Sequence, residues 1–140
     1  MIATIRTYFD ARVKAVDPEL SFYEDDVFGD NDVNAVEAQN NYNLIIGTTN
    51  TTRQDNGFLD EVEVELDVWS SKGVNIYDDY ETLYCLAYKI KNECIKLENV
   101  AAEDCLSEVE AISITPLEEP TNDNVFKMRL NFIVRLYYRP

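Results

Sequence analysis

The stretch Glu61-Val62-Glu63-Val64-Glu65-Leu66-Asp67-Val68-Trp69 decides the fold. Acidic and apolar residues alternate strictly along it, which predicts a β-strand with one apolar face and one acidic face. The apolar face contains Val62, Val64, Leu66 and Val68, and the acidic face contains Glu61, Glu63, Glu65 and Asp67. Like charges about 7 Å apart on one strand repel each other, so the acidic face must meet water or cations.

Further elements can be predicted on both sides of this strand. Helical periodicity predicts a first helix over residues 2–16 and a longer one over 76–97. Strands are expected at 42–49, at 59–70 around the acidic stretch, at 109–115 before Pro116, and at 125–138. This order of helix, two strands, helix and two strands predicts an α+β fold. We expect a single domain over residues 1–140, with a mostly antiparallel four-stranded sheet packed against two main helices.

The last predicted strand carries basic residues on the face that points away from the core. These residues are Lys127, Arg129 and Arg135. If the last strand lies beside the acidic strand, cross-strand ion pairs would offset part of the repulsion among the acids. The charge pattern therefore suggests that strands 59–70 and 125–138 are neighbours.

Composition excludes several classes of function. The 140 residues contain 27 acids, 12 bases and no histidine, for a net charge of −15. Non-specific binding to a phosphate backbone depends on clustered Lys and Arg, so this charge argues against it. Without histidine, the common Ser–His and Cys–His nucleophiles and His-ligated zinc are excluded. We expect no catalytic residues, no cofactor and no metal.

The smaller motifs of the sequence indicate neither a ligand site nor a membrane or secretion signal. The segment Asp30–Asn34 resembles the start of a calcium loop, but Ala35 replaces the required glycine and Asn41 the bidentate glutamate. No apolar run is long enough to span a membrane, and the N-terminus does not resemble a signal peptide. Cys85, Cys94 and Cys105 are expected to be free thiols in a reducing compartment.

Four tyrosines fall on one face of the second predicted helix, at spacings of three and four residues. They are Tyr77, Tyr80, Tyr84 and Tyr88. Their rings could cover the sheet with the hydroxyl groups at its rim, or they could form an interface, where tyrosine is enriched.

The element order resembles that of the tail terminator, or tail completion, proteins of long-tailed bacteriophages. The resemblance spans nearly the whole chain. It depends on the strand Tyr42-Asn43-Leu44-Ile45-Ile46-Gly47, the strand end Val68-Trp69-Ser70-Ser71-Lys72-Gly73, and the terminal strand from Phe126 to Leu136.

This resemblance implies a structural virion protein rather than an enzyme. Members of the family form a hexameric ring on the head-proximal end of the tail tube. The ring stops polymerisation of the tube protein and joins the tail to the head connector protein, and DNA passes through its lumen without specific binding. The expected partners are further copies of the chain, the tube protein and the connector protein. The expected location is the virion tail or neck, after assembly in the host cytoplasm.

Two sets of candidate residues follow. We hypothesise that the acidic strand faces the lumen, where Glu61, Glu63, Glu65 and Asp67 would repel DNA phosphates; the alternative is exposure to outer solvent. The candidate subunit-contact residues are Arg6, Arg12, Lys14 and Arg53, which could instead be ordinary solvated charges.

Three other functions remain open at this point. The chain could be another neck component, such as a head-completion protein. Its acidity would also suit a binding module that mimics DNA and occupies basic nucleic-acid-binding proteins. Finally, a small enzyme could work through carboxylates alone, although the sequence reveals no pocket for one.

Overall fold

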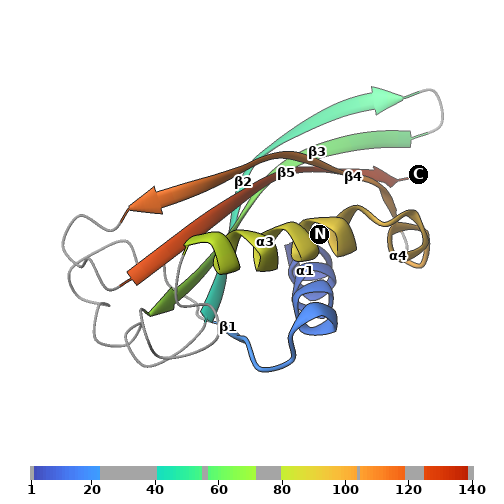
Figure 1. The fold of residues 1–140 in the computed structure, drawn as a ribbon. Helices are drawn as coiled ribbons and strands as arrows, with labels where there is room; N and C mark the ends of the chain where they lie inside the picture. Colours follow the sequence, from blue (N-terminus) through green and yellow to red (C-terminus); the bar gives the residue numbers. More distant parts are fainter. Residues whose placement is uncertain are drawn as a thin grey trace.

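The computed structural model describes the backbone of residues 2–22, 41–54, 57–71, 80–103, 105–118 and 125–138, and the side chains of 4–20, 59–69, 80–103, 105–116 and 127–137. Its elements are α1 (Ile2–Val16), β1 (Ser21–Phe22), β2 (Asn41–Gln54), β3 (Gly57–Ser71), α3 (Tyr80–Ile95), α4 (Leu97–Ala101), β4 (Leu106–Glu118) and β5 (Val125–Tyr138). Figure 1 shows a long twisted sheet with the helices along one of its faces.

The sheet has the strand order β1-β2-β3-β5-β4. β3 and β5 lie side by side and antiparallel at its centre, and β2 and β4 flank them, also antiparallel. The predicted α+β class is therefore confirmed. The expected count of four strands is wrong, because Ser21–Phe22 adds a short parallel strand beside β2. Two residues are too few to show a strand period, so this strand left no readable pattern in the sequence.

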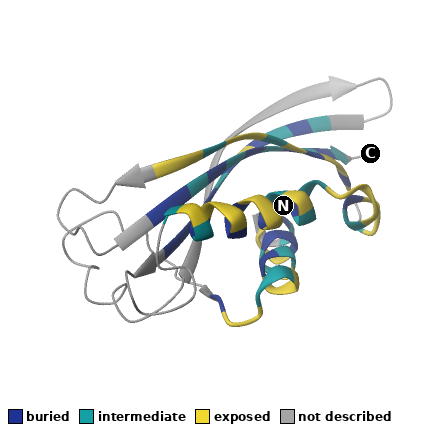
Figure 2. Ribbon diagram, viewed as in Figure 1, coloured by how far each residue is buried: buried dark blue, intermediate teal, exposed yellow. Residues whose placement is uncertain are grey.

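The apolar faces of α1, α3 and the sheet meet in one core. The predicted strand face of Val62, Val64, Leu66 and Val68 is buried throughout. Figure 2 shows buried residues on the sides of α1 and α3 that face the sheet. From α1, Phe9 reaches the sheet, and its ring centroid lies 5.1 Å from that of Phe132 on β5. The alternation of apolar and acidic residues thus predicted the core face of β3.

The second helix ends earlier than predicted. It was expected over 76–97, but α3 ends at Ile95 and a separate short helix, α4, begins at Leu97. The residue between them, Lys96, has an extended backbone with ψ of 122°. The Asn99 side chain donates a hydrogen bond to the Glu93 carbonyl oxygen (3.0 Å), which satisfies one of the last carbonyls of α3. Residues 72–79, where the helix was expected to start, lie outside the described part.

The strand expected at 109–115 is also longer, since β4 runs from Leu106 to Glu118. Pro116 was expected to end it but lies within the strand, opposite Met128. A proline is tolerated there because β4 is an edge strand, and half of its backbone N–H groups have no neighbouring strand to pair with. The register shifts twice along β4, between Leu106 and Glu108 and between Ala111 and Ser113.

The hairpin between β2 and β3 is tighter than expected. Its strands extend to Gln54 and from Gly57, and these two residues are opposite each other in the register. The Asn56-Gly57 turn signal in the sequence indicates a connection over 52–57, whereas the two strands leave only residues 55 and 56 between them. The stretch 24–41, whose many Asp, Glu and Asn residues indicate a long loop, lies almost wholly outside the described residues.

The contact between α1 and α3 buries two titratable side chains, Tyr8 and Cys94. The Tyr8 hydroxyl donates a 2.6 Å hydrogen bond to the Cys94 carbonyl oxygen, and both side chains are buried. Burial raises the pKa of the Tyr8 phenol and that of the Cys94 thiol above their ordinary values. In the unfolded chain these groups lose their protons at about pH 8.5 for Cys and pH 10 for Tyr.

We therefore expect stability to fall as the pH rises above about 8.5, because the unfolded state then binds fewer protons than the folded state. Thermal melts between pH 7 and 11 measure this. A Tyr8→Phe variant should be less stable at pH 7 by about 1 kcal/mol. Its alkaline decline should be shallower than that of the wild-type protein. An identical decline in the two proteins would contradict this assignment to Tyr8.

Candidate functional site

The face of the sheet opposite the helices is rich in ion pairs. β3 and β5 are neighbours with Asp67 opposite Arg129 and Glu61 opposite Arg135. The pairing suggested by the charge pattern is thus confirmed. The described side chains on this face of β3, β4 and β5 include six acids and three bases. The acids are Glu61, Glu63, Glu65, Asp67, Glu108 and Glu110, and the bases are Lys127, Arg129 and Arg135.

At one end of this face the charges are buried. Asp67 is fully buried, and Lys127 is 2% exposed. One Asp67 carboxylate oxygen lies 3.1 Å from Lys127 Nζ, and the Arg129 guanidinium donates two hydrogen bonds to the same carboxylate, at 2.8 and 2.9 Å. A buried carboxylate is stable only when such partners replace its water. Asp67 therefore fixes the register of β3 against β5 and has no exposed charge.

At the other end the charges face solvent. Arg135 Nη1 donates to Glu108 and Glu110 at 2.9 Å each, and Arg135 Nε to Glu61 at 3.2 Å. The hydrogen bond that Arg135 donates to Glu110, together with attraction to Glu108, raises the pKa of Arg135 above its ordinary value. One guanidinium thus bridges β3, β5 and β4 among three carboxylates. Glu63 is also exposed, and Glu65 lies 3.5 Å from Arg129. This end therefore has a surplus of negative charge.

Two acids of this face, Glu108 and Glu110, were not among the sequence-based candidates. The strand was expected to begin only at residue 109. The alternation Glu108-Val109-Glu110-Ala111 contains the signal, since Val109 is buried and both glutamates are exposed. Only the register of β4 against β5 shows that these glutamates lie beside Arg135.

The candidate subunit-contact residues do not form one cluster. Arg6 pairs with Asp10 on α1 at 3.9 Å, and Arg12 stacks over Tyr8 with 5.7 Å between its Cζ and the ring centroid. Lys14 donates hydrogen bonds to the carbonyls of Pro18 and Leu20 just beyond α1. Arg53 lies near the end of β2, opposite Phe58 in the register, and its side chain is outside the described set. Their role between subunits stays a prediction.

The tyrosine face of the second helix is partly exposed. Tyr84 and Tyr88 are 44% and 46% exposed, and their rings stack at 6.5 Å between centroids. Tyr80 is half-buried, and Tyr77 lies outside the described residues. On the same helix Cys94 is buried and Cys85 exposed. The outward-facing rings thus leave a contact surface on α3.

Other sites raised by the sequence are not visible in the described part. No group of three or more acids and cysteines there is placed to hold a metal ion. The calcium-like segment 30–34 lies outside it. Among the described helices, none is both long and apolar enough to cross a membrane.

Comparison with known proteins gives a fold match and no family. No family model matches the sequence, and no curated protein matches it either. Among solved structures, 27 chains match. One is a chain of the virion of a native gene transfer agent particle. It is 13% identical, with a TM-score of 0.62, over 98% of this chain and 91% of that one. The protein therefore has the fold of a chain found in the virion of a gene transfer agent particle.

Proposed function

We propose that this protein is a structural virion protein that forms a hexameric ring at the head-proximal end of a phage-type tail tube. The ring stops tube polymerisation, joins the tube to the head connector, and lets DNA pass through its lumen. The observation that carries the proposal is the likeness in fold to a chain of a gene transfer agent virion over almost the full length of both chains. The resemblance in element order to tail terminator proteins supports it from the sequence.

The charged sheet face suits a lumen. We infer that the solvent-facing acids Glu61, Glu63, Glu65, Glu108 and Glu110 line the DNA path. Arg135 and Arg129 hold several of these acids in place, and the acids outnumber the bases. Six copies would multiply this surplus around the channel, so phosphates would find a repelling wall. Asp67 does not contribute, because it is buried against Lys127.

A tube-length assay tests the terminator role. The tail tube protein encoded in the same genome is polymerised with increasing amounts of this protein, and tubes are measured by electron microscopy. We expect shorter tubes, with a ring at one end only. Unchanged tube lengths with rings bound to the connector protein alone would instead identify a head-completion protein. Binding to basic nucleic-acid-binding proteins, with no ring and no tube contact, would identify a DNA mimic.

Neutralising the acidic face tests the lumen assignment. We expect a Glu61→Gln, Glu63→Gln, Glu65→Gln triple variant to assemble but to release DNA from particles several-fold more slowly, because phosphates would contact the wall more often. Release is followed with a DNA-binding dye. A Glu19→Gln, Glu98→Gln, Glu103→Gln variant changes the charge equally at sites away from this face and should release DNA at the wild-type rate. Equal release rates in both variants would remove the acidic strand from the lumen.

A further inference from the structure

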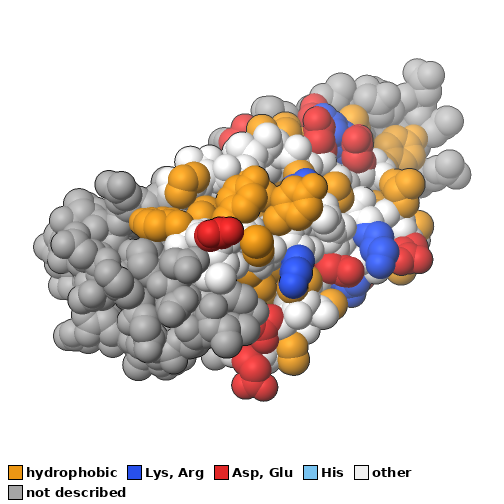
Figure 3. Space-filling model, viewed as in Figure 1, with side chains coloured by type: hydrophobic (Ala, Val, Ile, Leu, Met, Phe, Trp, Pro, Cys, Tyr) orange, Lys and Arg blue, Asp and Glu red, His pale blue; other side chains and the backbone are white. Residues whose placement is uncertain are grey.

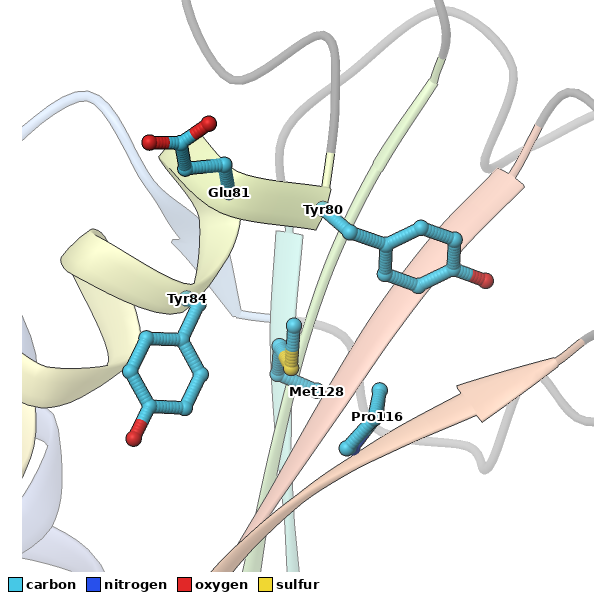
Figure 4. A pocket seen from close by; sticks show the side chains of 5 residues that line it. All are labelled: Tyr80, Glu81, Tyr84, Pro116 and Met128. Atoms are coloured by element: carbon cyan, nitrogen blue, oxygen red, sulfur yellow. The ribbon is translucent and has the colours of Figure 1, made fainter.

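A groove runs between α3 and the edge strand β4, on the side of the sheet that bears the helices. Its larger part has a volume of about 560 Å³ and is lined mainly by Tyr80, Tyr84, Met128 and Pro116. Figure 4 shows the Tyr80 and Tyr84 rings on either side of Met128, with Pro116 on the side of Tyr80, while the Glu81 carboxylate points away. This part of the groove is therefore apolar and aromatic.

The groove continues along α3 past Tyr84. Its second part, about 240 Å³, lies between Tyr88 and Lys91 on the helix and the β4 segment around Ile112. Ile112 is 53% exposed at the register shift of β4. Figure 3 shows hydrophobic side chains gathered over α3 and along β4. The groove therefore has two hollows, and Tyr84 lines both of them.

The edge of β4 is poorly suited to pairing with a further strand. A continuous new ladder needs a regular row of backbone donors and acceptors. β4 has two register shifts, and Pro116 lacks an N–H group. Bulges and prolines of this kind protect an edge strand from pairing with another chain. A partner would therefore engage the groove through side chains rather than by extending the sheet.

We propose that the α3–β4 groove is the docking surface for a second copy of this chain, and that it forms one side of the contact between neighbouring subunits. This inference rests on the proposed ring. A closed ring built from identical subunits needs a head-to-tail contact between two different surfaces of the chain. The groove supplies one of them, with tyrosine anchors of the kind that dominate binding energy at interfaces.

Charge complementarity favours a second copy as the occupant. Among the described residues that line the groove, the basic one is Lys91, whose Nζ lies 4.1 Å from the Tyr88 ring centroid and is held there by a cation–π contact. The chain has a net charge of −15, so acids outnumber bases on a second copy as well. A lysine fixed among aromatic rings matches an acidic surface with apolar neighbours.

The test compares two pairs of variants by native mass, with circular dichroism to confirm folding. In the groove, Tyr84→Ser with Tyr88→Ser removes the anchors, and Lys91→Glu reverses the charge. The matched controls are Leu97→Ser, which removes an 83% exposed apolar side chain outside the groove, and Lys89→Glu, which makes the same charge change on the same helix. Lys89 is exposed and does not line the groove.

We expect both groove variants to raise the protein concentration needed for half-assembly by about tenfold or more, and both controls to assemble like the wild-type protein. If the groove variants assemble like their controls, the groove is not the contact, while the ring itself stands. If they assemble normally but no longer bind the tube or connector protein, the groove serves that partner and the proposal is wrong. If the wild-type protein forms no ring at any concentration, with or without the tube protein, both the proposed function and this inference fail.

Discussion

An Asp67→Asn variant should lose about 3–5 kcal/mol of unfolding free energy, the largest single-residue effect that we expect on this face of the sheet. The substitution removes the charge that balances Lys127, which is 2% exposed and 3.1 Å away. A buried ammonium without a counter-charge is much less stable than a solvated one. Denaturation with urea, followed by tryptophan fluorescence from Trp69, measures the loss.

A double variant distinguishes the effect of an unbalanced buried charge from the effect of changing the side chain at position 67. Asp67→Leu with Lys127→Met replaces the two buried charges by apolar groups, and Arg129 keeps Glu65 as a partner, so this variant should recover part of the stability lost in Asp67→Asn. Glu61→Gln breaks a half-exposed pair with Arg135 and should cost no more than about 1 kcal/mol. If Asp67→Asn loses less unfolding free energy than Glu61→Gln, the buried pair does not hold β3 to β5.

A Phe9→Ala variant should also lose about 3–5 kcal/mol of unfolding free energy. Phe9 is fully buried, and its ring packs against Phe132 on β5 and edge-on against Tyr8. Removing the ring leaves a cavity where α1 meets the sheet, and the surrounding core cannot close it completely. Urea denaturation measures the effect.

The control for this prediction is Thr7→Ala, an exposed position on the same helix. It should change stability by less than about 0.5 kcal/mol, because alanine favours a helix and no packed atom is lost. Similar losses in the two variants would mean that helix formation, rather than the Phe9 contact, determines the stability of α1.

Periodicity was sufficient to predict the long elements of this fold. The strict alternation at 61–69 located β3 and its core face, and the basic alternation at 127–135 identified β5 as its neighbour. Both patterns are local consequences of which side chains face the core. The end of α3 was missed because Lys96 and its neighbours favour a helix individually. In the structure the Asn99 side chain donates a hydrogen bond to the Glu93 carbonyl across the break, a contact that propensity does not encode.

The candidate site was only partly predictable for a related reason. The sequence treats Glu61, Glu63, Glu65 and Asp67 as equivalent acids on one face. In the structure Asp67 is buried against Lys127, while Glu63 is exposed, because burial depends on what packs over each end of the strand. Glu108 and Glu110 joined the face through the register of β4. The groove could not be predicted from the sequence, because it depends on how α3 lies over β4. The tyrosine spacing indicated only that these side chains share one face of the helix.

The central claim is that this protein acts as a repeated subunit of a ring, and the mass of its assembly on the tail tube tests that claim most directly. Six copies of 16.1 kDa give a ring of about 97 kDa. Native mass spectrometry of the protein released intact from tube ends should find that species, and end-on images should show six-fold symmetry. A single 16.1 kDa subunit under every condition, including saturating tube protein, would contradict the account.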